Sequence, residues 1–468
     1  MINHVLNILS FEMIVLGVIV GALLMFFAIR WSASCFLLGF PVLLFLGQVK
    51  DFFPASVSAS AAIFPIIAVI GQIFRGHRFT FNRCEKSLIV LALLMVCSVS
   101  YSSYPVYGLD KAILFCFMVV PIIIFAPQVI NGVRSLRIAV SIISMSFIVY
   151  VFWSALLLGG LEAIEGRMAF LSDVIRAGQF FGAASIVSLV HVAYGKRTIA
   201  NVFFYGCLMA TSLFLLFVTG TRAALLGVVL TMMFIYWFAY IDWFQRIVNK
   251  AGKTYAIIFF AIIFISTGVF FLKQTLPQQS IVRFASIENF FSNFSPSELK
   301  NWQESKSRAL NYFSAIEGFC SHPLGGVGAG GYGSVMNKYR NIQLYNYRGE
   351  IVHFYPHNMV LEFAVEQGVF GLFLILYVLY INFKMILFLR RYVHKEPEHR
   401  SLVVFCVSIY VYGLLVSMTS LDIPRMMILW WGMGLLLATE RIYNLQRSFC
   451  SERLKVEVNN QYFLQGIE

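Results

Sequence analysis

The stretch "HFYPHNMVLEFAVEQGVFGLFLILYVLYINF", residues 353–383, decides the fold class. Most of it is apolar, and the apolar part exceeds the roughly 20 residues that an α-helix needs to span a bilayer. His357 and Asn358 precede this part, and Glu362 and Glu366 lie inside it. Asn358, Glu362 and Glu366 are four residues apart, so they share one stripe of a helix. Because ionisable groups at membrane depth usually face a cavity or a partner, we expect the stripe to face the interior of a helix bundle.

The composition of the whole chain is that of a membrane protein. Of its 468 residues, 59% are hydrophobic and only 12% are charged, whereas about 25% are charged in a soluble domain. The amino-terminal segment has no basic region followed by a small-residue cleavage site, so we expect it to form the first span. The eight cysteines form no CxxC pair, which argues against a disulfide scaffold and against metal ligation by cysteine. We therefore expect residues 1–468 to form a single integral membrane domain.

Hydropathy predicts an all-α polytopic fold with about 12–13 transmembrane helices. The thirteen apolar runs lie near residues 11–29, 33–49, 58–74, 87–103, 109–130, 138–159, 177–194, 200–219, 222–241, 254–272, 359–383, 400–419 and 426–440. Several runs are short, so both the number of spans and the side of the amino terminus stay open. One long loop, residues 273–358, separates the last three runs from the others.

The basic residues predict the orientation of the spans. The net charge is +13, and most of the excess lies in short connections between apolar runs, as the positive-inside rule predicts, so we expect no nucleic-acid partner. Twenty-one of the 35 lysines and arginines lie in one set of connections; six, including Lys111, Arg222 and Arg425, lie in short loops on the other side. We therefore expect the larger set to be cytoplasmic and the long loop to face the periplasm of a bacterium.

The long loop has predicted structure of its own. Ser295, Pro296 and Glu298 form a capping box, and apolar residues then recur at helical spacing, which predicts an amphipathic helix at the membrane surface. This helix should end before "SHPLGGVGAGGYG", residues 321–333, which contains six glycines. Such a turn could present backbone N–H groups to a phosphate, or it could simply be a compact connection.

Three residues are the main candidates for chemistry. His357 could be a general base at the outer mouth of the bundle, because histidine changes its charge near neutral pH, or it could cap a helix. Arg222 begins a span, where it could bind an anion with help from the helix dipole or anchor the helix at the interface. Arg308 could bind an anion or be a solvated charge on the amphipathic helix. Further possible substrate-binding residues are Asn358, Glu362, Arg283, Arg340 and Arg348.

These residue types favour one substrate class. Several arginines and one good base, without a cluster of metal ligands, suit a substrate with a pyrophosphate leaving group, which needs electrostatic stabilisation more than it needs an acid. No nucleotide-binding loop, GxSxG segment or HExxH segment occurs in the chain. We therefore expect no metal ion and no cofactor.

Three segments carry a resemblance to a known family. They are "TGTRAALLG", "SRALNYFSAIEGFCSHPLGGVGAGGYG" and "HNMVLEFAVEQGVFGLFL", all within residues 200–385. Their order and spacing resemble the O-antigen ligase and polymerase superfamily of bacterial inner-membrane glycan enzymes. The Gly-Gly pair at 325–326 departs from the family pattern, in which a bulky residue often precedes the second glycine. Outside this region the chain resembles the family in hydropathy alone.

The resemblance implies a reaction and a set of roles. It implies metal-independent, inverting transfer of a glycan from an undecaprenyl-pyrophosphate donor by a membrane glycosyltransferase of the GT-C type, among membrane lipids and at the periplasmic face of the inner membrane. His357 matches the family's base, and Arg222 and Arg308 match the arginines that hold the donor pyrophosphate.

The acceptor leaves several functions open. Lipid A–core as acceptor would make the protein an O-antigen ligase, which we favour; a second lipid-linked glycan would make it a polymerase, and a protein side chain an oligosaccharyltransferase. A non-enzymatic transporter of lipid-linked sugars is a further alternative. Transporters often have repeated halves and broken helices, and the sequence indicates neither.

Overall fold

The computed structural model describes residue 30 and residues 32–46, 63–76, 79–157, 174–195, 198–248, 308–340, 354–395, 399–420 and 422–465. Every long element in these ranges is a helix, which confirms the all-α prediction. The α-helices are α2 (Ser32–Leu46), α4 (Ile63–Phe74), α5 (Arg83–Ser98), α6 (Pro105–Leu114), α7 (Val120–Val129), α8 (Val133–Leu157), α9 (Val174–Tyr194), α10 (Ile199–Thr219), α11 (Arg222–Val248), α14 (Arg308–Ser321), α15 (Tyr332–Arg340), α16 (Met359–Lys395), α17 (Arg400–Ser417) and α18 (Met427–Gln465).

Eight helical stretches in the described part of the chain are long and apolar enough to cross a membrane. They coincide with eight of the predicted runs, and α2, α4 and the first half of α18 coincide with three more. The predicted runs at 11–29 and 254–272 lie outside the described residues. The fold is therefore that of a polytopic membrane protein, and the total of 12–13 spans stays a prediction.

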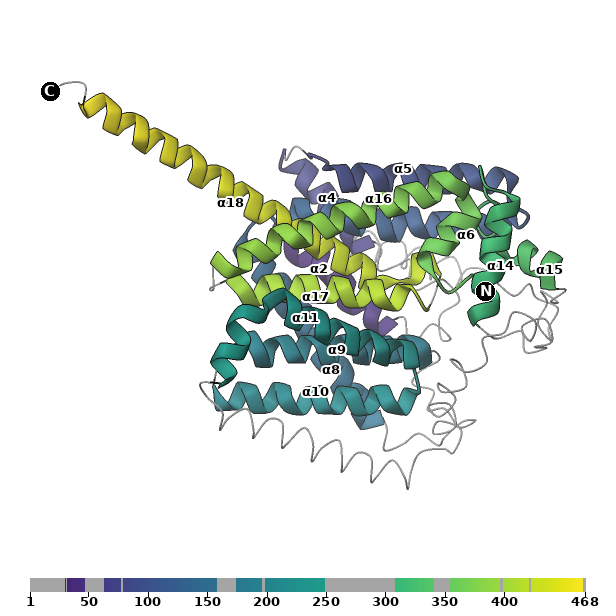
Figure 1. Cartoon of the computed structure of the whole chain (residues 1–468), viewed down its shortest axis with the longest axis horizontal. Helices are drawn as coiled ribbons and strands as arrows, with labels where there is room; N and C mark the ends of the chain where they lie inside the picture. Colours follow the sequence, from purple (N-terminus) through teal and green to yellow (C-terminus); the bar gives the residue numbers. More distant parts are fainter. Residues whose placement is uncertain are drawn as a thin grey trace, which may run out of the picture.

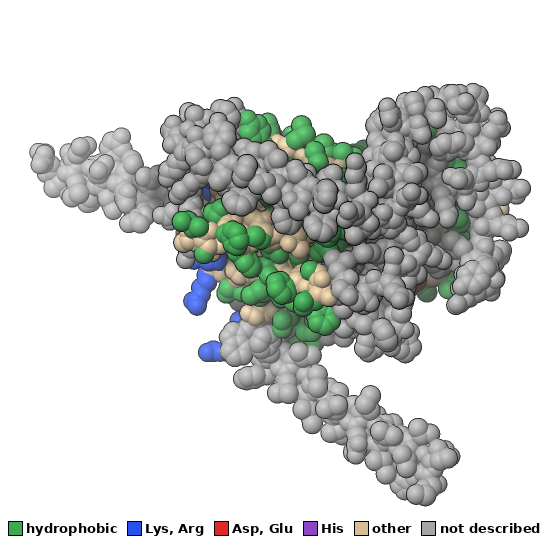
Figure 2. All heavy atoms as spheres, turned by 90° about the horizontal axis from the view of Figure 1, so that it is seen from below, with side chains coloured by type: hydrophobic (Ala, Val, Ile, Leu, Met, Phe, Trp, Pro, Cys, Tyr) green, Lys and Arg blue, Asp and Glu red, His purple; other side chains and the backbone are tan. Residues whose placement is uncertain are grey.

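The long helices form one bundle with an apolar surface. In Figure 1, α5 and α16 run side by side, and α17 packs against α9 and α11. Phe115 and Trp430 meet edge-on inside the bundle with 5.7 Å between their ring centroids. Large apolar side chains such as Phe152, Phe203 and Phe373 are exposed on its outside, and hydrophobic side chains dominate the described surface in Figure 2. A continuous apolar exterior is expected where lipid replaces water as the solvent.

The bundle has two polar ends. The loop end comprises residues 98–107, 176–179, 219–222, 308–340, 354–368, 418–420 and 422–427, and α14 and α15 lie there in Figure 1. The basic end comprises residues 75–76, 79–86, 128–137, 390–395, 399–400 and 441–446, which are joined by contacts such as that from Arg441 to Thr80. The described basic residues of the predicted cytoplasmic set, such as Arg83 and Arg391, gather at the basic end. Figure 2 shows Lys and Arg side chains on the left of the coloured, described surface. Which end faces the periplasm stays a prediction.

A π-helical segment joins α6 and α7 into one continuous span. The segment is Phe115–Val119, just before Pro121. Proline cannot donate the usual backbone hydrogen bond, and a widened turn accommodates this loss. Because α6 already begins at Pro105, Lys111 lies inside this span and is 1% exposed. The prediction that Lys111 belongs to a short loop is therefore wrong.

Helix α16 is broken at Gly368, where φ is 66° and ψ is −153°. The carbonyl groups of Val365 and Glu366, just before the break, accept hydrogen bonds from the N–H groups of Val327 and Gly328, each at 2.9 Å. The N–H of Val369, just after it, donates to the Pro323 carbonyl at 2.7 Å. The glycine-rich loop therefore fills the break. The prediction that the chain contains no broken helix is therefore wrong.

Candidate functional site

His357 has an unusual backbone conformation at the loop end. Its φ is 60°, and it is the one non-glycine residue with positive φ in the described part of the chain. A non-glycine residue in the left-handed region costs about 1–3 kcal/mol and persists only where its surroundings enforce it, often at functional sites. Pro356 precedes it and is buried, and the Tyr355 ring lies 4.5 Å from the His357 ring between centroids. The His357 side chain is therefore half-buried and packs against the Tyr355 ring.

Asn358 links this strained position to two neighbouring helices. Its side-chain oxygen accepts a hydrogen bond from the Leu361 N–H at 3.0 Å, which caps α16. Its side-chain nitrogen donates to the Met418 carbonyl at 3.2 Å. The same carbonyl accepts a hydrogen bond from the Tyr312 hydroxyl of α14 at 2.9 Å. The start of α16, the end of α17 and the first turns of α14 therefore meet at one carbonyl group.

Arg308 is the first residue of α14, one turn before Tyr312. The contact of Tyr312 with Met418 therefore brings the backbone of Arg308 to the same end as His357, as the motif order requires. The Arg308 side chain lies outside what the structure describes. Its role in binding an anion stays a prediction.

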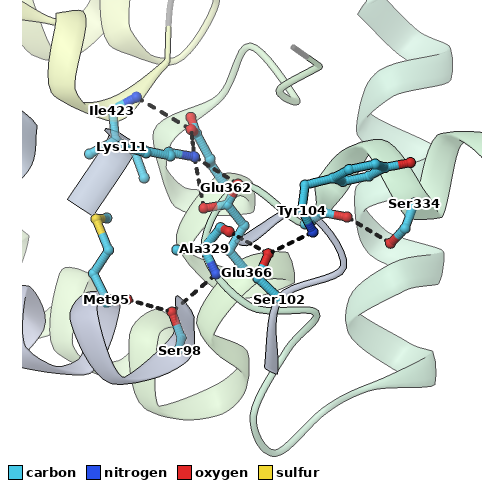
Figure 3. Close-up of polar contacts among 11 residues, drawn as sticks. Met95, Ser98, Ser102, Tyr104, Lys111, Ala329, Ser334, Glu362, Glu366 and Ile423 are labelled. Carbon is cyan, nitrogen blue, oxygen red and sulfur yellow. Dashed lines mark hydrogen bonds and ion pairs between the residues drawn. The ribbon is translucent and has the colours of Figure 1, made fainter. Parts of the chain in front are cut away.

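Glu362 and Glu366 form a buried cluster with Lys111 (Figure 3). The Lys111 ammonium donates to both oxygens of Glu366 at 2.7 Å and to Glu362 Oε1, and all three side chains have 0% exposure. Glu362 Oε1 also accepts a hydrogen bond from the Ile423 N–H at 3.3 Å. The prediction that this stripe faces the bundle interior is confirmed, and the cation it meets is a lysine of α6. The cluster joins α6, α16 and the turn before α18.

The glycine-rich loop packs against the α5–α6 turn and the broken helix. Ser98 Oγ accepts from the Ala329 N–H at 3.1 Å, and Ser102 Oγ donates to the Ala329 carbonyl at 2.7 Å (Figure 3). Gly328 has φ +82°, and a Cβ there would lie 2.6 Å from the Ser102 Cα. Because the N–H groups of Val327, Gly328 and Ala329 all donate within the protein, these three do not form a phosphate cradle. The compact-connection alternative is the one that the structure supports.

Arg222 is the first residue of α11 and is half-buried. It follows Gly220, which ends α10 with φ 62°. A turn and a half further along α11, Gly227 packs against Val416 and Tyr412 of α17. Arg222 therefore lies at the loop end, at the start of a helix that packs against α17.

The remaining candidates are only partly covered by the structure. Arg283 and Arg348 lie outside the described residues, as does the capping box at 295–298. Arg340 is the last residue of α15, and its side chain is not described. Among the residues described, no group of three His, Cys, Asp or Glu side chains is arranged to hold a metal ion.

The described parts of the three motif segments, residues 219–227, 308–333 and 357–374, thus meet at one end of the bundle. Residues 207–376 match the family model described as O-Antigen ligase. The match covers roughly a third of the chain and contains all three segments, so the resemblance to this superfamily is confirmed. It supports a role in ligating or polymerising lipid-linked glycans by a membrane enzyme. No curated protein matches the chain significantly.

Two features that lie next to the family-matched segment were not identified as functional from the sequence. Lys111 is one of them, although a lysine within an apolar run is itself a signal, since a charge at membrane depth needs a partner. The other is the turn from Met418 to Met426, where Arg425 and Asp422 form an ion pair at 3.6 Å. Its residues come from outside the family match, and only the fold brings them to His357.

Proposed function

We propose that this protein transfers a glycan from an undecaprenyl-pyrophosphate donor to an acceptor hydroxyl at the periplasmic face of the bacterial inner membrane. One observation carries the proposal. His357 occupies a strained backbone position that Asn358 and Tyr355 hold at the end of the bundle where the three motif segments of the O-antigen ligase family meet. Strain of this kind is maintained at a cost in stability, which favours a functional role for the imidazole.

The proposed reaction is a single inverting displacement. The His357 imidazole accepts the proton of the acceptor hydroxyl while that oxygen forms a bond to the anomeric carbon of the donor sugar. The bond between this carbon and the pyrophosphate oxygen breaks, and the pyrophosphate leaves with the electron pair. Arg222 and Arg308 bind the pyrophosphate and stabilise the charge that develops on it. In this scheme no metal ion takes part. Transfer that continues in the presence of a chelator would support this point, and transfer that stops would contradict it.

The other residues proposed to bind substrate contribute unequally. Asn358 uses its side-chain oxygen and nitrogen inside the protein, and Glu362 is fully buried against Lys111. We therefore propose that these two mainly position the start of α16. Arg283, Arg340 and Arg348 remain candidates for contacts with the charged parts of the donor or the acceptor.

We propose lipid A–core as the acceptor, and polymerisation of lipid-linked repeat units is the alternative. Transport receives less support, because backbone groups of the glycine-rich loop fill the break in α16, whereas broken helices in transporters line a substrate path.

Complementation of polysaccharide-deficient bacterial strains tests the proposal. One compares wild type with His357→Asn, since asparagine tolerates the left-handed backbone, and with His322→Asn, an exposed histidine at the same end, as the control. Long glycan chains on core that disappear in His357→Asn, with lipid-linked polymer accumulating, support ligation. Single repeat units on core support polymerisation instead. Unchanged glycan from His357→Asn contradicts the assignment of the base.

A further inference from the structure

Three hydrogen bonds, to Asn358, Tyr312 and Glu362, anchor the turn between α17 and α18 to the site. Its first residue, Met418, accepts hydrogen bonds from Asn358 and Tyr312 through its carbonyl. The Ile423 N–H donates to Glu362 at 3.3 Å, and the Ile423 carbonyl accepts from the Trp430 indole N–H at 2.8 Å. Because the Glu362 carboxylate is itself held by buried Lys111, the turn has a fixed position relative to the start of α16.

Arg425 is the cationic side chain of this turn. Its Nε lies 3.6 Å from Asp422 Oδ1, and its side chain is 41% exposed while that of Asp422 is 2% exposed. A separation of 3.6 Å is too long for a hydrogen bond. In the described part of the chain Asp422 is its one ion-pair partner. The buried carboxylate therefore faces the Nε side of the guanidinium without using up its hydrogen-bond donors.

The hydrogen bonds that anchor the turn place Arg425 at the loop end, where the His357 segment also lies. Asp422 raises the pKa of the Arg425 guanidinium most, burial lowers this pKa, and Tyr107, Tyr355 and Asp110 add smaller increases. The Tyr355 ring is the one that packs against the His357 ring at 4.5 Å. A permanently charged guanidinium therefore lies at the same end of the bundle as the proposed base.

We propose that Arg425 binds a phosphate group of the substrate beside His357, and that Asp422 positions its guanidinium for this contact. The planar guanidinium presents donors in a fixed fork that matches phosphate oxygens. The more exposed partner of this ion pair is the arginine, and among the described residues its guanidinium has no hydrogen-bond acceptor within reach in Asp422. The proposal rests on the proposed function. It adds a third arginine, from outside the family-matched segment, to Arg222 and Arg308.

A binding measurement tests this assignment without relying on transfer activity. Purified full-length protein in detergent is titrated with inorganic pyrophosphate, and the dissociation constant is followed by the shift in thermal unfolding. Arg425→Gln should weaken binding about tenfold or more, the usual effect of losing a charge-assisted contact. Arg425→Lys should weaken it less, and Arg83→Gln, an exposed arginine at the basic end, should leave it unchanged.

A kinetic measurement identifies the source of the phosphate. If the group belongs to the donor, Arg425→Gln raises the KM for lipid-linked pyrophosphate; if it belongs to the acceptor, the KM for the acceptor rises instead. Asp422→Asn should change the same constant in the same direction by a smaller factor. Folded Arg425→Gln protein with an unchanged dissociation constant and both KM values unchanged overturns the assignment. Transfer that survives in His357→Asn contradicts the proposed function but leaves the pyrophosphate measurement decisive for Arg425.

Discussion

Replacing Lys111 by methionine is expected to destabilise the protein strongly. The substitution keeps an unbranched side chain as far as Cε and removes the ammonium group that binds Glu362 and both oxygens of Glu366. Both carboxylates have 0% exposure, so water cannot replace the lost cation. Breaking a buried ion pair in this way costs about 3–5 kcal/mol, because a charge is left uncompensated. We expect the free energy of unfolding to fall by about that amount.

Two further variants separate lost charge from lost packing. Lys111→Met combined with Glu362→Gln and Glu366→Gln leaves no charge in this cluster, so most of the lost stability should return. Lys86→Met, an exposed lysine at the basic end, should change the unfolding free energy by at most about 0.5 kcal/mol. Thermal unfolding in detergent, followed by size-exclusion chromatography of a fluorescent fusion, measures all three. A Lys111→Met protein as stable as the Lys86→Met protein would refute the reasoning.

Two smaller changes probe the elements around His357 by the same unfolding measurement. Gly368→Ala should lower the free energy of unfolding more than Gly76→Ala does. Both positions have positive φ, but only a Cβ at 368 would meet backbone, the Pro323 carbonyl oxygen at 2.7 Å. Equal losses of unfolding free energy would show that this close approach is unimportant. Asn358→Ala removes a helix cap and should lower the free energy of unfolding by about 0.5–2 kcal/mol. It should also lower glycan transfer, since the residue next to His357 loses its hydrogen bond to the Met418 carbonyl. Full transfer by Asn358→Ala would contradict the proposed positioning of His357.

The membrane fold and the direction of the carboxylate stripe could be predicted from the sequence. Hydropathy over about 20 residues is a local property, and eight of the predicted runs coincide with the helices that are long and apolar enough to span a membrane. The inward direction of Glu362 and Glu366 follows from helical spacing and from the cost of exposing charge to lipid. Both arguments use residues that are close together in the chain.

The partners of these groups could not be predicted in the same way. Lys111 is 251 positions before Glu362, and no local pattern relates the two. The break at Gly368 was missed because glycine within an apolar run is compatible with a continuous helix. Its cause is the hydrogen bonding of Val327 and Gly328 to α16, which only the folded chain reveals. The same contacts explain why the glycines at 326 and 328 serve close packing of backbone.

The most direct test of the central claim is the transfer rate of purified protein carrying His357→Asn. With a lipid-linked pyrophosphate donor and a matching acceptor, loss of the general base should lower kcat by about 10²–10⁴-fold. The unfolding midpoint should stay near that of the wild type, and His322→Asn should keep the wild-type rate. A folded His357→Asn protein that transfers glycan within twofold of the wild-type rate would contradict the account.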